Sequence, residues 1–159
     1  MPREKNFYLT ERGLKRIKKE YEDLKRVKLS KIKKEPPSLL HSQDLNPEYL
    51  SFRETLDFLE AKIAESEYIL KNVKLIKKPP KGKQTIVTLG ATVTLEERDG
   101  QINEFMIVGT LEANPNEGKI SYKSPVGKAL LGRKIGDELT ITSPIRVVYR
   151  VRKIKYYSI

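Results

Sequence analysis

Apolar positions in the first half of the chain recur with a helical period. From Leu14 to Leu24 they follow steps of three, four and three, which is the narrow stripe of a helix that packs against one partner. Thr10 is a suitable N-cap for this helix. Pro36 and Pro37 end it, because proline lacks an N–H and disfavours helical geometry in the residue before it. The pattern therefore predicts a first long helix between Thr10 and the prolines.

A second helical stripe is longer and more regular. Its positions follow steps of four and three without interruption, and every residue except Ser66 is apolar, which is typical of a coiled-coil seam. Asn46 can cap this helix, and Pro47 suits its first position, where the missing N–H costs nothing. The stripe consists of Tyr49, Phe52, Leu56, Leu59, Ile63, Ser66, Leu70 and Val73.

Two stripes joined by a short connection predict an antiparallel two-helix coiled coil over residues 1–78. Helices of roughly 25 residues form a rod about 40 Å long, because each residue adds about 1.5 Å. An ordinary two-helix part of a bundle is the alternative, but the rest of the chain offers no third amphipathic helix. We therefore expect a projecting hairpin with its tip at about residues 36–48.

The second half of the chain changes to the period of strands. Residues 89–95 alternate and are rich in β-branched side chains, which favours a strand. Asp99 and Gly100 form a strong signal for a tight hairpin turn, and residues 102–110 follow as the partner strand. Further strands are expected around residues 119–122 and 145–156.

One short helix interrupts these strands. Ser124 and Pro125 resemble an N-cap and a first helical position, and Gly132 can end the helix. We therefore expect a small antiparallel-sheet domain with one short helix over residues 84–159, joined to the hairpin by a linker at residues 79–83. The whole chain is then of the α+β class.

Composition narrows the classes of partner, the kinds of site and the cellular location expected for the protein. The chain carries 32 Lys and Arg against 21 Asp and Glu, a net charge of +11, which indicates a polyanionic partner or simply a basic surface. It has no cysteine, so disulfides and thiolate metal sites are excluded. No apolar run approaches the roughly 20 residues that span a bilayer, and the opening residues lack the apolar core of a secretory signal. We expect a cytoplasmic protein without a membrane partner.

A basic run lies just before the predicted tip and contains no acidic residue. It has two interpretations: a solvated helix face, or a surface that lies near RNA phosphates in an anionic channel. Residues 41–50 differ sharply from it, because they contain acidic residues but no Lys or Arg. The run consists of Lys25, Arg26, Lys28, Lys31, Lys33 and Lys34.

Four stretches of the chain match the motifs of one family. The opening YLTERGL (residues 8–14) is similar to Y-L-T-x-x-G-x, and LDFLEAKI (56–63) is similar to Q-G-F-L-E-G-R-I. LGATV (89–93) corresponds to F-G-A-T-V, and SPVGKALLGRKIGD (124–137) corresponds to S-P-I-A-x-A-L-I-G-K-x-x-G-D. In this order they cover nearly the whole chain. The chain resembles the bacterial Gre transcript-cleavage factors, closest to the GreA type.

This resemblance implies an N-terminal coiled coil and an FKBP-like C-terminal domain. Family members insert the coil through the secondary channel of RNA polymerase, and the C-terminal domain docks at the channel rim. Tip carboxylates, here Asp44 and Glu48, then help to hold the second catalytic Mg²⁺ and a water, and the polymerase cleaves the RNA 3′ end of a backtracked complex. The factor is accessory and not itself an enzyme. The basic run would line the polymerase- and RNA-facing side of the coil.

The resemblance also assigns a signature to the polymerase-docking domain. We expect its residues to be largely structural; the acidic one, for example, follows a glycine directly before a strand, as turn residues do. We expect no metal in the free protein, Mg²⁺ shared with the polymerase, and a monomer. The signature residues are Ser124, Pro125, Gly132, Gly136 and Asp137.

The tip departs from the family pattern G-D-L-x-E-N-A-E-Y. Asp44 matches the first acid, but two residues are missing before Tyr49, and Pro47 stands where the second acid belongs. Glu48 can replace that acid if the shortened loop points it outward. An alternative function is therefore a channel-binding regulator or inhibitor without cleavage activity. A stand-alone prolyl isomerase is a third possibility, against which the chain has no Trp and no evident aromatic pocket.

Overall fold

A computed structural model describes residues 4–142 and 145–158. The chain separates into two compact units. The helical unit is Leu14–Asn72, and the sheet unit combines Met1–Gly13 with Val73–Ile159. The sheet unit is thus built from two pieces of chain that flank the helical unit in the sequence. No helix among the described residues is long and apolar enough to cross a membrane.

The units do not divide at the linker expected at residues 79–83. Strand β1 (Phe7–Leu9) pairs in parallel with β4 (Val73–Leu75), so both ends of the helical unit enter the same two-stranded sheet. The expected linker lies inside the sheet unit, where Lys81–Lys83 form a short 3₁₀ helix, η1. The backbone pairing of β1 with β4 explains why the first residues of the chain belong with its second half.

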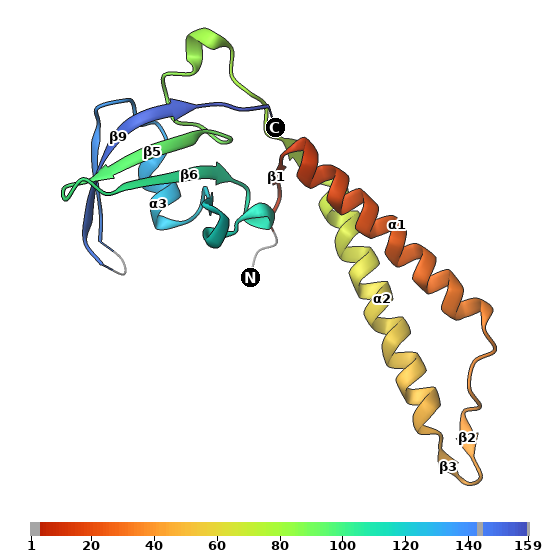
Figure 1. Ribbon diagram of the computed structural model, residues 1–159. Coiled ribbons are helices and arrows are strands. Elements are labelled where there is room, and N and C mark those ends of the chain that lie inside the picture. The colour runs from red at the N-terminus through yellow and green to blue at the C-terminus, as the bar shows by residue number, and fades with distance from the viewer. Residues whose placement is uncertain (1–3, 143–144, 159) are drawn as a thin grey trace. The chain divides into compact units, whose positions relative to one another are not determined.

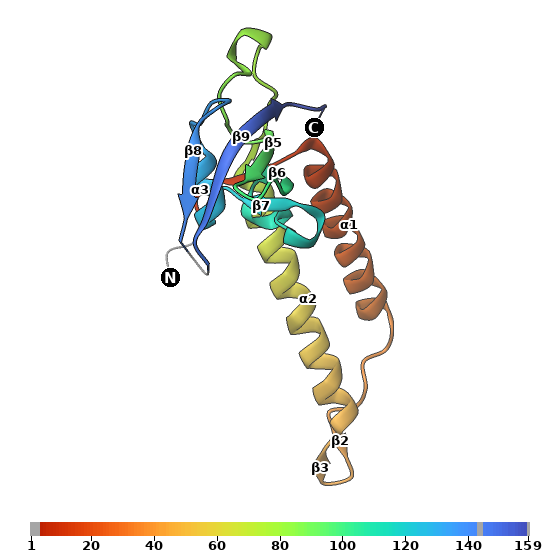
Figure 2. The same ribbon diagram turned by 60° about the vertical axis from the view of Figure 1, so that its left-hand side comes forward.

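The helical unit is the expected hairpin of two long helices. Helix α1 spans Glu11–Lys33 and α2 spans Pro47–Lys71, and they lie side by side in both ribbon views (Figures 1 and 2). Asn46 is the N-cap of α2, with Pro47 in the first turn, as the sequence predicts. Helix α1 ends slightly before the two prolines, which agrees with the bias of pre-proline residues against helical geometry.

Two contacts between side chains set the register of the hairpin. The hydroxyl of Tyr21 donates to Glu67 Oε1 at 2.8 Å, and Lys28 Nζ lies 3.3 Å from Glu60 Oε1. Both pairs are centred on position 44, which is the relation expected of antiparallel helices. Asp44 is therefore the midpoint of the hairpin in register as well as a residue of its tip.

The seam of α2 is partly as expected. Its buried residues are Leu56, Leu59, Ser66 and Ile69, so Ser66 keeps its place in the stripe, while Ile69 is buried more deeply than the expected Leu70. Placing Val73 in the seam was wrong, because α2 ends at Lys71 and Val73 begins β4. The apolar residues of the distal part of α1 are exposed: Val27, Leu29 and Ile32.

The sheet unit contains a five-stranded sheet in the order β7-β6-β5-β9-β8. All neighbours are antiparallel except β6 and β7, which are parallel. The expectation of a purely antiparallel sheet was therefore wrong at this edge. The chain crosses over through the 3₁₀ turns η2 (Thr110–Glu112) and η3 (Pro115–Glu117) instead of folding back as a hairpin. The strands are β5 (Thr92–Glu97), β6 (Ile102–Val108), β7 (Lys119–Ser121), β8 (Glu138–Ile141) and β9 (Val147–Lys155).

The core of this unit lies between the sheet and the short helix α3 (Pro125–Leu130). Leu95, Ile107, Leu130 and Val151 are fully buried there. Burial of such side chains contributes about 1.5–3 kcal/mol each. Exposed and buried positions alternate along β8, which is the period of a strand with one face against the core.

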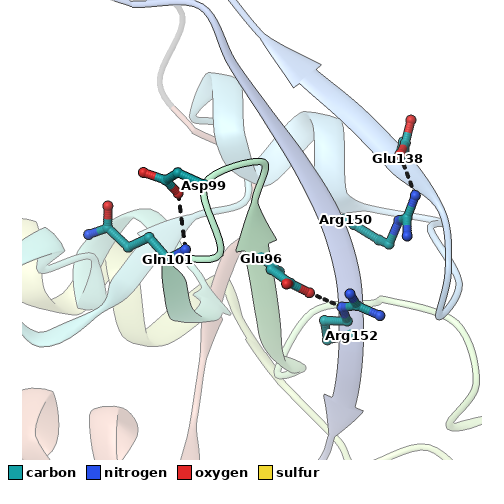
Figure 3. Close-up of polar contacts among 6 residues, drawn as sticks. All are labelled: Glu96, Asp99, Gln101, Glu138, Arg150 and Arg152. Carbon is teal, nitrogen blue, oxygen red and sulfur yellow. Dashed lines mark hydrogen bonds and ion pairs between the residues drawn. The ribbon is translucent and has the colours of Figure 1, made fainter.

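Charged side chains join neighbouring strands of the sheet (Figure 3). Arg152 of β9 pairs with Glu96 of β5, and Arg150 of β9 donates to Glu138 of β8 at 2.8 Å. Asp99 Oδ1 accepts from the backbone N–H two residues later at 3.0 Å, in the turn between β5 and β6. Cross-strand pairs of this kind contribute about 0.2–1 kcal/mol each.

Candidate site at the hairpin tip

The tip of the hairpin is a small β-ribbon that the sequence did not predict. Strand β2 (Leu40–His41) pairs antiparallel with β3 (Asp44–Leu45), so that Asp44 lies opposite His41. The ribbon lies beyond the ends of both helices (Figure 1). Ser42 begins the turn with φ = 62°, a left-handed conformation that costs a non-glycine residue about 1–2 kcal/mol. The usual Asn-Gly or Asp-Gly signal is missing here, which explains why sequence patterns did not reveal the turn.

Asn46 holds this ribbon to the start of α2. Its side-chain Oδ1 accepts from the N–H of Glu48 at 3.0 Å, and its Nδ2 donates to the carbonyl of Ser38 at 2.8 Å. Its backbone N–H donates to the carbonyl of Leu39 at 3.0 Å, and its backbone carbonyl accepts from Leu50 at 3.2 Å. Asn46 is 9% exposed, so these bonds are shielded from water. The sequence predicted the cap but not the bonds to residues 38 and 39.

Asp44 and Glu48 are both exposed, and neither carboxylate makes a hydrogen bond or ion pair with another described residue. Glu48 lies in the first turn of α2, where a negative charge is favourable near the helix N-terminus. Among the described residues there is no group of three or more His, Cys, Asp or Glu that could hold a metal ion. The tip therefore presents two exposed carboxylates whose oxygens are free of hydrogen bonds and ion pairs with other described residues.

The basic run divides into two parts. The three residues farther from the tip make ion pairs within the hairpin: Lys25 with Glu22, Arg26 with Asp23, and Lys28 with Glu60. The three nearer the tip make no ion pair with any residue in the described ranges, although the C-terminal end of α1 favours positive charge. These unpaired cations are Lys31, Lys33 and Lys34.

Apolar side chains are also exposed at the tip. Leu45 is 58% exposed and Leu40 is 52% exposed. Exposed apolar residues that gather in one place often mark a surface that contacts another protein. The apolar residues exposed in and beside the ribbon are Leu39, Leu40, Leu45 and Leu50.

The signature residues of the sheet unit build α3 and the turns after it. Ser124 is the N-cap of α3, and its hydroxyl accepts from the N–H of Gly127 at 3.0 Å; Pro125 follows in the first turn. Gly132 and Gly136 have φ of 82° and 92°, which favour glycine. Asp137 Oδ2 accepts from the N–H of Lys134 at 2.8 Å. These contacts give each residue a structural role, and docking to a partner stays a prediction.

Comparison with known proteins identifies the family. The family model "Transcription elongation factor, N-terminal" matches residues 7–75, and "Transcription elongation factor, GreA/GreB, C-term" matches residues 82–156. Transcription elongation factor GreA of Bacillus licheniformis is 40% identical over 147 residues, covering 91% of this chain and 92% of that protein. The corresponding protein of Mycoplasma genitalium is 42% identical over 152 residues, covering 93% and 94%.

Two solved structures align with most of the chain, at low sequence identity and low TM-score. The GreA factor homolog 1 (Gfh1) of Thermus thermophilus is 27% identical, with a TM-score of 0.43 and coverage of 94% of this chain and 99% of that one. The elongation factor GreA/GreB of Nitrosomonas europaea is 20% identical, with a TM-score of 0.45 and coverage of 96% and 100%. On the family models and the sequence identities, this chain belongs to the GreA/GreB family of transcription elongation factors.

Proposed function

We propose that this protein stimulates RNA polymerase to cleave the RNA 3′ end of backtracked, arrested complexes. The observation that carries the proposal is the position of Asp44, which lies in the turn region of an antiparallel hairpin whose register is centred on it. A narrow two-helix hairpin suits a partner with a deep channel. It can carry the exposed carboxylates of Asp44 and Glu48 into that channel, while the polymerase supplies the reaction centre.

The carboxylates suit a shared divalent ion. Mg²⁺ prefers hard oxygen ligands and keeps several waters, and a Mg²⁺ bound there would stabilise charge and activate a water for phosphodiester hydrolysis. Asp44 would contribute one oxygen ligand. Glu48, exposed in the first turn of α2, would stand in for the acid that Pro47 replaces. Both side chains would act as ligands or water-positioning groups, with no nucleophile or proton donor required from this chain.

The surface beside the tip supports a polymerase partner. Lys31, Lys33 and Lys34 lack ion pairs within the described part of the chain, so their charge is available to RNA phosphates. The exposed leucines of the ribbon supply apolar contact area. A protein that acts on transcription in this way would work in the bacterial cytoplasm, and we propose that it acts as a monomer.

Two other functions have less support. A channel-binding regulator without cleavage was suggested by the missing second acid, but relatives that are 37–42% identical over most of the chain are named as GreA elongation factors. A prolyl isomerase would need an apolar, aromatic pocket. A hollow on the sheet beside β9 is instead lined mainly by charged residues, namely Glu96, Glu97, Arg98, Glu138, Arg150 and Arg152, with Val148 and Tyr149.

A cleavage assay on backtracked RNA polymerase tests the proposal. Wild-type protein should shorten the RNA from its 3′ end, and Asp44→Asn should reduce the rate at saturating factor at least tenfold. Glu48→Gln, tested separately, should reduce it if Glu48 replaces the missing acid. Asp57→Asn is the matched control, because Asp57 is an exposed carboxylate of α2 that pairs with Arg53 four residues away. No shortening by wild-type protein, or full activity of Asp44→Asn, would refute the proposal.

A further inference from the structure

The β-ribbon of the tip is too small to be stable by itself, so other contacts must hold it in place. We call these contacts the clamp. Strands β2 and β3 have two residues each, and even a longer isolated two-stranded hairpin is marginal in water. The left-handed Ser42 adds a local cost. Pro36 and Pro37 lie outside both helices, so α1 does not continue to the ribbon.

Asn46 supplies the bonds that the ribbon lacks. All four of its hydrogen-bonding groups are used within the tip, and they reach both sides of it: Ser38 and Leu39 before β2, and Glu48 in α2. Bonds made by a buried polar residue are protected from competition by water.

We infer that Asn46 is a positioning residue, which fixes the carboxylates of Asp44 and Glu48 relative to each other. This inference rests on the proposed cleavage function. Asp44 lies two residues before Asn46 and Glu48 two residues after it, so the clamp lies between the two acids in the chain. Misplacement of a reacting group by about 1 Å can cost about a hundredfold in rate, and a mobile tip would lose that geometry even with both acids present.

The substitution Asn46→Ser separates clamping from capping. Serine is a good N-cap and can accept from the N–H of Glu48, but it has no amide donor to reach the carbonyl of Ser38. The matched control is Asn72→Ser at the opposite end of α2, where Asn72 Nδ2 donates to the carbonyl of Tyr68 at 2.7 Å. Each variant removes one side-chain amide donor to a backbone carbonyl of the same unit.

The test measures cleavage of backtracked RNA as a function of factor concentration, together with helix content by circular dichroism. For Asn46→Ser we expect about a tenfold lower rate at saturation, an unchanged concentration for half-maximal effect, and unchanged helix content. Asn72→Ser should retain the wild-type rate. A wild-type rate for Asn46→Ser, or a loss of apparent affinity alone, would overturn the inference.

Hydrogen exchange tests the clamp without any activity measurement. The N–H of Asn46, which donates to Leu39, and the amides of β2 and β3 should exchange at least tenfold faster in Asn46→Ser than in the wild type. Unchanged exchange would overturn the clamp even if cleavage were slow. If the wild-type protein clamps its tip but does not cleave RNA, the proposed function fails, and with it the positioning role, while the clamp itself stands.

Discussion

The carboxylate of Glu112 accepts two hydrogen bonds from Thr10, one from its backbone N–H at 2.8 Å and one from its hydroxyl at 2.6 Å. The hydroxyl of Thr10 in turn accepts from the N–H of Gly13 at 3.0 Å, which is the capping bond predicted from the sequence. Glu112 thus places negative charge at the N-terminus of α1, where it is favourable. The carboxylate of Glu112 therefore holds Thr10 in place and orients the Thr10 hydroxyl for capping.

Replacing Glu112 by Gln should therefore destabilise the protein. Gln removes the charge and leaves one of the two donors of Thr10 without an acceptor, so we expect a loss of about 1–3 kcal/mol in the free energy of unfolding. Urea denaturation at neutral pH measures it. The control is Glu117→Gln, which removes only a surface pair with Lys119 at 3.3 Å and should cost at most about 0.5 kcal/mol. Equal losses in the two variants would contradict the role given to Glu112.

Gly109 is required by a close approach of backbone to backbone. A Cβ at this position would lie 1.9 Å from the carbonyl oxygen of Tyr8 in β1. Gly109→Ala must therefore displace β1, at a cost of about 3 kcal/mol. A Cβ at Gly82 would meet nothing within 4 Å, so Gly82→Ala should change stability by no more than about 0.5 kcal/mol. Thermal or urea unfolding compares them, and equal stability of the two variants would exclude this explanation.

Glu4 should give the stability a dependence on acid pH. Partial burial alone would raise the pKa of Glu4, but hydrogen bonds from Lys123 and Thr110 and the charge of Lys123 outweigh it, so the pKa lies below its ordinary value of 4.5. The folded state then binds this proton less readily than the unfolded state. The stabilisation is complete above about pH 4.5 and disappears as the pH falls through the lowered folded-state pKa.

The variant Glu4→Gln isolates this effect. It should be less stable than the wild type at pH 7, and the difference should shrink as the pH falls below 4. Chemical denaturation at several pH values measures both proteins. Glu35→Gln serves as control, because Glu35 is exposed and makes no ion pair with any residue in the described ranges. A difference for Glu4→Gln that stays constant from pH 7 to pH 3 would show that ionisation is not its cause.

Reversing charge near the tip should weaken binding to RNA polymerase. Lys31→Glu combined with Lys33→Glu changes two cations that have no ion-pair partner in the described part of the chain. We expect about a tenfold lower affinity at low salt, with a smaller effect at high salt because exposed charges are screened. The control is Lys18→Glu with Lys19→Glu, which makes the same charge change at exposed positions farther back on α1. Equal weakening by both pairs would indicate a response to net charge alone, and unchanged affinity at low salt would refute the prediction.

The long-range layout of the chain was predictable where local signals agree. The apolar stripe predicted helix α2, and Asn46 with Pro47 predicted where it begins. The cap residue, the proline and the apolar period all indicate the same boundary. The pairing of β1 with β4 was not predictable. Each strand has three residues, too short for a period, and the partners are separated by the whole helical unit. Strand β7 was predicted, but its parallel pairing with β6 was not, since strand patterns do not encode direction.

The candidate site shows the same division. Asp44 and Glu48 were selected because they match acids of a family motif, and their exposure agrees with that choice. The bond from Asn46 to the carbonyl of Ser38 could not be found in this way. Every residue has a backbone carbonyl, so the residue type at position 38 gives no indication of this hydrogen bond. The sequence shows which chemical groups are present, and the fold determines which of these groups come into contact.

The parallel pairing of β1 with β4 also constrains the order in which parts of the chain can fold during synthesis. A ribosome delivers Phe7–Leu9 first, but their strand partner Val73–Leu75 emerges only after both long helices have been made. The two helices carry their own mutual contacts and can associate as soon as they leave the exit tunnel. The N-terminal segment therefore has no strand partner until Val73–Leu75 have been synthesised. The sheet unit can be completed only when the helical hairpin has brought the two ends of the hairpin together.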